Sequence, residues 1–456
     1  MKIEKKQLNL FNVFCIGLGG AIGSGIFVMM GAGIGYTGHS VVLTVSLGCV
    51  YMLLAYFFHL VLSSMFVMVG GDYDARAMLF SPLMTGVYAM FITLNNFGMA
   101  AYASSTVDYV SMVFPQIENY RTILAILLIT VLFATTIRGS KFVATLMSVM
   151  TVVMVVSIAL FCAFGVGKVQ PGFFDGDTFF LNGGTGFLMS IAIMSFACMG
   201  TTMAPFSQMA VTKNATKTTP KAILLVTVAL ALIYALTGYV ASGVLPVEQV
   251  AGENLAVVAA EIFPNWLYIV FVLGGAAFAI MTSMTGGIIG MRYPMLRVAD
   301  DGWIPAVFKK TTKDGYPYVT MLVIYIICII PLILGFSLDE IISLIMIPNT
   351  LINCYMNFSL RKIVRRFPKA WENSILHMPL PLFDFLCILA ALCNIVIAAS
   401  LMTSLTPLSG ALAVVLLLAC FAISYLRLKT GAVSREKLLQ NKEDMFKKYE
   451  KEEATV

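Results

Sequence analysis

Charged residues are scarce in this sequence. Asp, Glu, Lys and Arg make up 11% of its 456 residues, whereas an average soluble domain carries about 25%. Hydrophobic residues account for 59% of the chain. Such a composition cannot cover a water-facing surface, so it excludes an ordinary soluble protein and indicates an integral membrane protein.

Motifs for nucleotide, metal and disulfide chemistry are also lacking. There is no G-x-x-x-x-G-K-[ST] loop, so we expect no use of ATP. The nine cysteines are scattered through apolar runs without a C-x-x-C pair, which favours packing roles. No intramembrane His, Glu or Asp constellation accompanies a nucleophile, so we expect neither an enzyme nor a bound metal or cofactor. The net charge of +6 is unevenly spread, which indicates membrane topology rather than nucleic-acid binding.

The sequence does contain long apolar runs. A helix needs about 20 mostly apolar residues to cross the hydrocarbon core of a bilayer. That length predicts an all-α integral membrane protein with about twelve transmembrane helices. The predicted spans are 10–36, 41–69, 83–113, 122–138, 142–166, 184–210, 221–245, 265–297, 318–335, 340–360, 380–403 and 407–428.

The basic residues predict how these spans are oriented. With a cytoplasmic N-terminus and twelve crossings, only Arg121 and Lys168 of the 29 Lys and Arg residues fall outside. We therefore predict a multi-pass protein of the cell membrane with both termini in the cytoplasm. The polar start of the chain favours the absence of a cleavable signal peptide. Within the polar tail 429–456, residues 435–453 mix Lys with Glu, which is typical of a solvated helix or a disordered end.

Two of the predicted spans should not be continuous helices. Gly23, Ser24 and Gly25 lie mid-span, and glycine costs about 1 kcal/mol per position in a helix interior. Small residues often serve helix packing in membranes, but a spacing of two does not form one packing face. We therefore predict an interruption at residues 22–25. Small and polar residues at the centre of the sixth span predict a second one at 196–200.

Paired interruptions in corresponding helices indicate a transporter site near the bilayer midplane. A broken helix presents N–H groups at the start of its second half, which favour an anion. It presents carbonyls at the end of its first half, which favour a cation. One site with both ends could hold a zwitterionic α-amino acid.

Six segments of the chain are similar, in order, to the motifs of one transporter family. They are residues 19–27, 70–73 with Ser81-Pro82, 138–141, 196–200, 213–220, and Arg292 with 299–305. Together they resemble the amino acid permease branch of the amino acid–polyamine–organocation (APC) superfamily. The resemblance implies a LeuT-like fold, in which two inverted five-helix repeats with broken helices one and six are followed by two extra helices. The implied parts are an N-terminus 1–9, repeats 10–166 and 167–360, extra helices 361–428 and a cytoplasmic tail 429–456.

The resemblance also implies a substrate site. The backbone of Gly23, Ser24 and Gly25 would bind a carboxylate, and Phe196 would be an aromatic gate. The amino group would meet carbonyls near Ala21, Ile22, Phe196 and Ala197, beside Gly200. Possible further cavity-lining residues are Asn95, Asn96, Ser195, Cys198 and Thr201, although the two asparagines could equally join helices.

The chain departs from the family pattern where a coupling ion is concerned. The family often has a lysine in the fifth span, and this chain has Met154 there. Thr282 and Ser283 could supply hydroxyl ligands to Na⁺, or could simply bond back to their own helix. Asp108 is the only candidate proton carrier in a core helix, unless it faces the external vestibule. For His59 a packing role is favoured, and coupling to H⁺ or Na⁺ stays open.

These features predict a secondary active transporter, a symporter or exchanger, that moves an α-amino acid by alternating access. Transport of a polyamine or another organic cation is the alternative, but it would require several carboxylates in the cavity. A non-transporting sensor on the same fold is also possible. The expected partners are an amino acid and the lipid bilayer, without nucleic acid or ATP.

Overall fold

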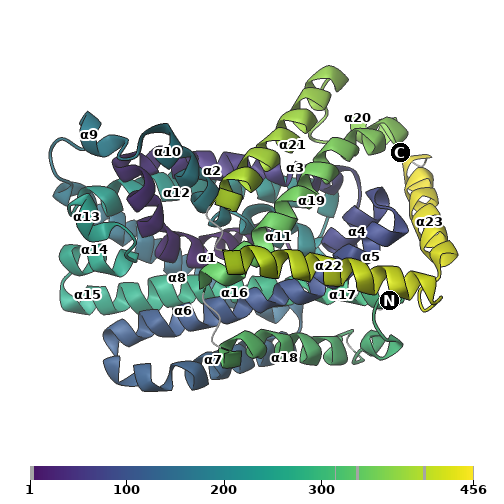
Figure 1. Cartoon of the computed structure of the whole chain (residues 1–456), viewed down its shortest axis with the longest axis horizontal. Helices are drawn as coiled ribbons and strands as arrows, with labels where there is room; N and C mark the ends of the chain where they lie inside the picture. Colours follow the sequence, from purple (N-terminus) through teal and green to yellow (C-terminus); the bar gives the residue numbers. More distant parts are fainter. Residues whose placement is uncertain (1–4, 314, 335–337, 404–406, 455–456) are drawn as a thin grey trace.

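The computed structural model describes residues 5–313, 315–334, 338–403 and 407–454 (Figure 1). Side chains at 24, 28, 95, 176, 334, 338–346, 403, 407–409 and 454 lie outside that description. Within the described ranges the elements are helices, and one isolated parallel bridge joins Leu8 to Thr212.

The first half of the chain runs from α1 to α12. Its helices are α1 (Leu10–Thr37), α2 (Val41–Ala55), α3 (Phe57–Met65), α4 (Gly71–Leu79), α5 (Pro82–Leu94), α6 (Gly98–Val113), α7 (Arg121–Thr136), α8 (Ser140–Gly165), α9 (Gly176–Phe179), α10 (Gly183–Phe196), α11 (Gly200–Ser207) and α12 (Ala215–Gly243). A short 3₁₀ turn, η2 (Asn95–Phe97), joins α5 to α6.

The second half runs from α13 to α23. Its helices are α13 (Val247–Val250), α14 (Leu255–Ile262), α15 (Asn265–Val270), α16 (Phe278–Gly290), α17 (Arg292–Asp300), α18 (Tyr318–Leu334), α19 (Leu338–Arg366), α20 (Pro368–Glu372), α21 (Leu380–Thr403), α22 (Pro407–Lys429) and α23 (Arg435–Ala454). A π-helical stretch, η6 (Phe271–Ala277), connects α15 to α16.

Many of these helices suit a bilayer. In the part of the chain that the structure describes, nine helical segments are long and apolar enough to cross a membrane. The remaining predicted spans correspond to α5 with α6, to α18 and to α19. Outer helices such as α7 and α22 expose large apolar side chains, including Ile123, Leu127 and Leu418. Exposed apolar surface on this scale is rare on soluble monomers and suits lipid, so the chain is a multi-pass membrane protein.

Helix α1 lies at the centre of the bundle and packs against α8, α10, α11, α12 and α16 (Figure 1). Most of its side chains are buried, including Ile22, Ile26 and Phe27. Burial on all sides explains why α1 shows no polar stripe: a helix surrounded by other helices needs none. The interrupted part of α1 is therefore held inside the protein.

The last helix, α23, lies across one end of the molecule, against α4 and α5 (Figure 1). One face of α23 is buried, with Phe446 and Tyr449 exposed by only 7% and 3%. The ring of Tyr449 lies tilted against that of Phe66, with 4.3 Å between the ring centres, and the Tyr449 hydroxyl donates to the carbonyl of Val67 over 3.3 Å. The predicted tail helix is thus present, but it is packed on the body instead of being fully solvated.

Candidate functional site

Gly23 interrupts α1. Its φ of −6° and ψ of −130° are not helical, although the chain is helical on both sides. A Cβ atom on Gly23 would fall 1.7 Å from the Oγ of Ser283 on α16. Only glycine therefore permits this approach of α16, and the interruption predicted at residues 22–25 is present.

The second interruption separates α10 from α11. Helix α10 ends at Phe196 and α11 begins at Gly200. Between them, the amides of Cys198, Met199 and Thr201 bond to carbonyls three residues earlier, over 2.9–3.1 Å. This tighter spacing replaces the α-helical pattern. The interruption predicted at residues 196–200 is therefore also present.

The two interruptions touch each other. A Cβ atom on Gly25 would lie 2.4 Å from the Cα of Ala197, and one on Gly200 would lie 2.3 Å from the carbonyl of Gly20. These distances are far below van der Waals contact, so both glycines are required for the backbones to meet. Segments about 175 residues apart in sequence thus form one structural unit.

Tyr234 on α12 ties this unit together. Its buried hydroxyl lies 3.0 Å from the carbonyl oxygen of Ala21 and 3.2 Å from that of Ala197. A phenol has one proton, so it donates to one of these carbonyls at a time. Tyr234 is not among the residues predicted from the sequence, although a tyrosine in the middle of an apolar span signals a buried hydroxyl that needs a partner.

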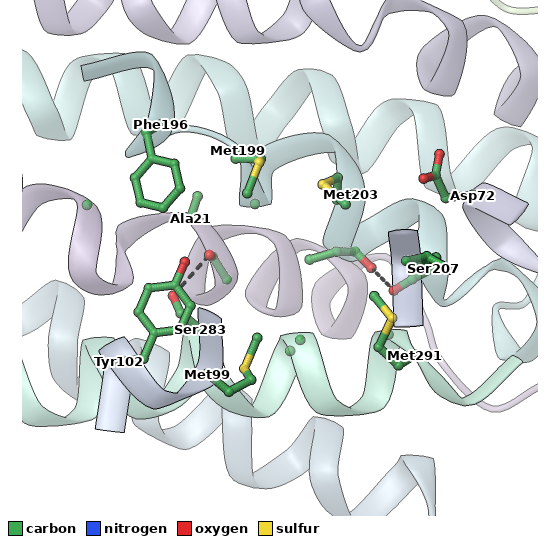
Figure 2. A pocket seen from close by; sticks show the side chains of 18 of the residues that line it. Ala21, Asp72, Met99, Tyr102, Phe196, Met199, Met203, Ser207, Ser283 and Met291 are labelled. Carbon is green, nitrogen blue, oxygen red and sulfur yellow. Dashed lines mark hydrogen bonds between the residues drawn. The ribbon is translucent and has the colours of Figure 1, made fainter. Parts of the chain in front are cut away.

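A cavity of about 140 Å³ runs along the paired interruptions (Figure 2). Ala21 and Phe196 lie at one end of it, and Asp72 and Ser207 lie at the other (Figure 2). Its wall between these ends is mostly apolar. The methionines that line it are Met99, Met199, Met203 and Met291.

The sequence of the chain matches a known protein family over most of its length. The family model described as amino acid permease matches residues 8–423. The chain belongs to the amino acid permease family. This permease is therefore a membrane transporter and not an enzyme, and the predicted APC membership is confirmed.

Individual relatives are distant. The branched-chain amino acid permease BcaP of Bacillus subtilis (strain 168) is 24% identical over 346 residues, which cover 70% of this chain and 72% of BcaP. The uncharacterized amino acid permease YvbW of the same strain is 23% identical over 70% of this chain and 74% of its own. The cadaverine/lysine antiporter of Escherichia coli (strain K12) is 26% identical, over 51% of this chain and 53% of its own.

Some of the residues predicted to bind substrate line the cavity, and others do not. Ile22 and Gly23 are buried and are not among the lining residues, and the side chain of Ser24 lies outside the described residues. The predicted residues that line the cavity are Ala21, Gly25, Phe196, Ala197 and Gly200.

Four of the five additional residues that we predicted to line the cavity are not among its lining residues. The hydroxyls of Ser195 and Thr201 bond back to carbonyls of their own chain segment, over 2.6 and 2.8 Å. The amide of Asn96 donates to Thr93 over 3.0 Å. Cys198 is buried with its sulfur 3.1 Å from that of Cys49. These polar groups satisfy local partners away from the cavity wall, and the side chain of Asn95 lies outside the described residues.

Thr282 and Ser283, the predicted ion-site residues, reach from α16 to the first half of α1. The Thr282 hydroxyl lies 2.8 Å from the carbonyl oxygen of Gly19 and 2.7 Å from that of Ala279. The Ser283 hydroxyl lies 3.0 Å from the carbonyl oxygen of Gly20. Oxygen atoms from two helices therefore converge beside the interruption of α1, and oxygen is the ligand that Na⁺ prefers.

Asp108 does not contribute to the cavity. It is half exposed and pairs with Arg121, whose Nη2 donates to its Oδ2 over 2.7 Å. The carboxylate in the cavity wall is that of Asp72, on α4. In the sequence Asp72 belongs only to a motif of the family, because nothing local in the sequence places α4 against the cavity.

Asp72 is surrounded by donors. The Nε of Arg76 donates to it over 3.0 Å, and the hydroxyl of Tyr88 also donates to it. The Nε2 of His59 lies 2.7 Å from its Oδ1. Burial alone would raise the pKa of Asp72, but the charge of Arg76 and the hydrogen bonds from His59 and Tyr88 hold that pKa well below its ordinary value. Asp72 is therefore ionised.

Proposed function

We propose that this permease is a secondary active transporter that carries an α-amino acid with an apolar side chain by alternating access. The observation that carries the proposal is the position of the cavity, which joins the two interrupted helices. Backbone groups at interrupted helices recognise the two charges that all α-amino acids share. In such a site the backbone groups select α-amino acids as a class. The rest of the cavity wall selects among them by the side chain of the substrate.

The proposed pose follows from the ends of the helix halves. The substrate carboxylate would lie at the start of the second half of α1, near Gly25, and at the start of α11, near Gly200. The amino group would face the carbonyls of Ala21 and Ala197. Each carbonyl oxygen has two lone pairs, so Tyr234 leaves one for the substrate.

The wall of the cavity supports an apolar substrate side chain. Methionines from α6, α11 and the segments beside them face it, together with Phe196 (Figure 2). Methionine is flexible and polarisable, so it adapts to side chains of different shapes. The relative BcaP is named a branched-chain amino acid permease, and branched-chain amino acids have the apolar side chains that we propose for the substrate.

A diamine or polyamine is the second candidate substrate, since one relative is named a cadaverine/lysine antiporter. A second ammonium group in the cavity would need its own carboxylate. Among the described lining residues the only carboxylate is Asp72. That carboxylate already accepts hydrogen bonds from Arg76 and Tyr88 and lies beside His59, so it has little capacity left for a ligand.

We also propose the finer architecture that the family implies. The nine membrane segments, with α5–α6, α18 and α19, would make twelve crossings. The pairing of α1 with α10–α11 is the arrangement expected of two inverted repeats with broken first helices. Both termini would then lie in the cytoplasm, as the distribution of basic residues suggests.

A Na⁺ site at Thr282 and Ser283 remains one candidate for ion coupling. Their hydroxyls already bond to the carbonyls of Gly19 and Gly20, which holds α16 against α1 without an ion. A bound cation would have to replace these hydrogen bonds. Replacing Na⁺ by choline should abolish accumulation if this site couples transport, and Ser283→Ala should weaken the Na⁺ dependence.

The experiment that tests the proposed substrate class is counterflow in proteoliposomes. Proteoliposomes that contain the purified permease are loaded with unlabelled leucine. The uptake of labelled leucine from outside, in exchange for the internal leucine, is then measured. We expect competition by isoleucine, valine and methionine, and none by isoamylamine or cadaverine, which lack the carboxylate. Competition by cadaverine at concentrations similar to those of leucine would favour the organic-cation alternative.

A further inference from the structure

A buried polar cluster closes the end of the cavity opposite Phe196. Its members come from the α2–α3 junction, α3, α4, α5 and α19, so several helices meet at one point. The guanidinium of Arg76 lies 4.4 Å from the ring centre of Tyr88, and its Nη2 donates to Asn353 over 3.0 Å. The cluster consists of Tyr56, His59, Asp72, Arg76, Tyr88 and Asn353.

His59 has an unusual place in this cluster. Because ionised Asp72 can only accept a hydrogen bond, the Nε2 of His59 carries a proton and donates it. The other ring nitrogen, Nδ1, is buried and has no hydrogen-bond partner among the described residues. The ring is stacked on Phe206 of α11, with 4.1 Å between the ring centres and 18° between the planes.

We propose that His59, supported by Asp72, binds a proton that is transported together with the substrate. This inference rests on the proposed function and adds its coupling ion. The step is a simple protonation, in which an N–H bond forms at Nδ1 with a proton from water and breaks again on release. No bond of the substrate changes.

The charges around His59 make Nδ1 the site of the added proton. The charged groups that act on the ring are Asp72 and Arg76, which neutralise each other, while Tyr56, Tyr88 and Asn353 are neutral. With Nε2 already protonated, an additional proton can only go to Nδ1. The resulting imidazolium would gain an ion pair with Asp72, and its face would lie on the ring of Phe206.

The contact with α11 gives this proton a way to act on transport. A buried imidazolium is costly, so the packed arrangement disfavours the extra proton. When α11 moves away from α3, Phe206 leaves the ring and water reaches Nδ1, which favours protonation. The same helix begins at Gly200 and carries Met203 in the cavity wall. Proton and substrate therefore both bias the position of α11, which is the requirement for coupling.

The test separates exchange from accumulation in proteoliposomes. Leucine counterflow, without ion gradients, reports the proposed function. Accumulation of leucine is then driven by a gradient of about one pH unit, alkaline inside, with valinomycin and equal K⁺ holding the membrane potential near zero. With one proton per substrate, such a gradient drives roughly tenfold accumulation. Pyranine inside the vesicles reports proton entry on addition of leucine.

We expect His59→Gln to keep counterflow within about twofold of the wild type, since the amide can still donate to Asp72. The same variant should lose pH-driven accumulation and leucine-dependent proton entry. His39→Gln is the matched control, because His39 is also stacked on a phenylalanine, Phe173, at 4.4 Å, and is not part of the cavity wall. It should behave like the wild type.

Several results would overturn the inference. One is pH-driven accumulation that persists in His59→Gln at the wild-type level. Another is wild-type accumulation that follows a Na⁺ gradient and not the pH gradient. If His59→Gln is not recovered folded, the wild-type pyranine measurement decides: leucine exchange without proton entry contradicts the inference and leaves the proposed function intact. Absence of counterflow with leucine, isoleucine, valine and methionine would overturn both.

Discussion

Replacing Gly200 by alanine tests whether the contact between the interrupted helices is needed for transport. The new Cβ would lie 2.3 Å from the carbonyl carbon and oxygen of Gly20 and 2.5 Å from the amide nitrogen of Ala21. Non-bonded carbon atoms sit about 3.5–4.0 Å apart, so α11 and α1 would have to separate by about 1 Å. All three atoms belong to the backbone and cannot rotate away.

The free-energy cost of this displacement can be compared with that of other overpacked sites in proteins. Overpacking of this kind typically costs about 1–3 kcal/mol. Because about 1.4 kcal/mol corresponds to a factor of ten, the arrangement with touching helices would be depopulated by a factor of roughly 5 to 150. We expect the rate of leucine counterflow by Gly200→Ala to decrease, relative to the wild type, by a factor within that range.

Gly184→Ala is the matched control for this variant. Gly184 lies in α10, and no heavy atom of a described residue beyond its own helix backbone lies within 4 Å of a Cβ built there. Counterflow and thermal unfolding of both variants would be measured in the same detergent and lipid. Wild-type transport and an unchanged melting temperature in Gly200→Ala would refute the view that the two backbones must meet.

Three further changes have defined expectations. Tyr234→Phe leaves the carbonyls of Ala21 and Ala197 without their shared donor, so it should lower the stability by about 1–3 kcal/mol, as measured by thermal unfolding, and change the apparent affinity for leucine. Asp108→Asn should leave transport and stability almost unchanged, because an exposed ion pair contributes about 0–1 kcal/mol; a large loss of uptake would restore Asp108 as a candidate proton carrier. Tyr449→Ala removes a buried ring of α23 and should increase proteolysis of the tail, and an unchanged cleavage rate would count against the docked position.

The interruptions could be predicted from the sequence because their cause is local. Glycines at positions 23 and 25 disfavour a continuous helix wherever the segment is placed. Membrane insertion likewise follows from composition and run length. In each case neighbouring residues alone supply the physical reason, and no knowledge of the fold is required.

The cavity wall could not be predicted in the same way. Asp72 reaches it only because α4 folds back onto α3, and His59 acquires its stacking partner from α11. Conversely, Ser195 and Thr201 are next to the interruption in sequence but turn toward their own segment. Rotation of a side chain about a helix axis is set by packing, so proximity in sequence is a poor guide to which polar group faces a ligand.

The docked position of α23 has a consequence for how the chain is made. Phe66 and Phe367 lie 5.0 Å apart by ring centres, and Tyr449 and Phe446 of α23 pack on them. The ribosome makes α23 after the helices α1–α22, so these aromatic surfaces stay uncovered until residues 435–454 have been synthesised. A chain that stops before residue 435 would keep the nine membrane segments found in the described residues but would leave this aromatic patch uncovered, as a surface for aggregation and for quality-control proteins.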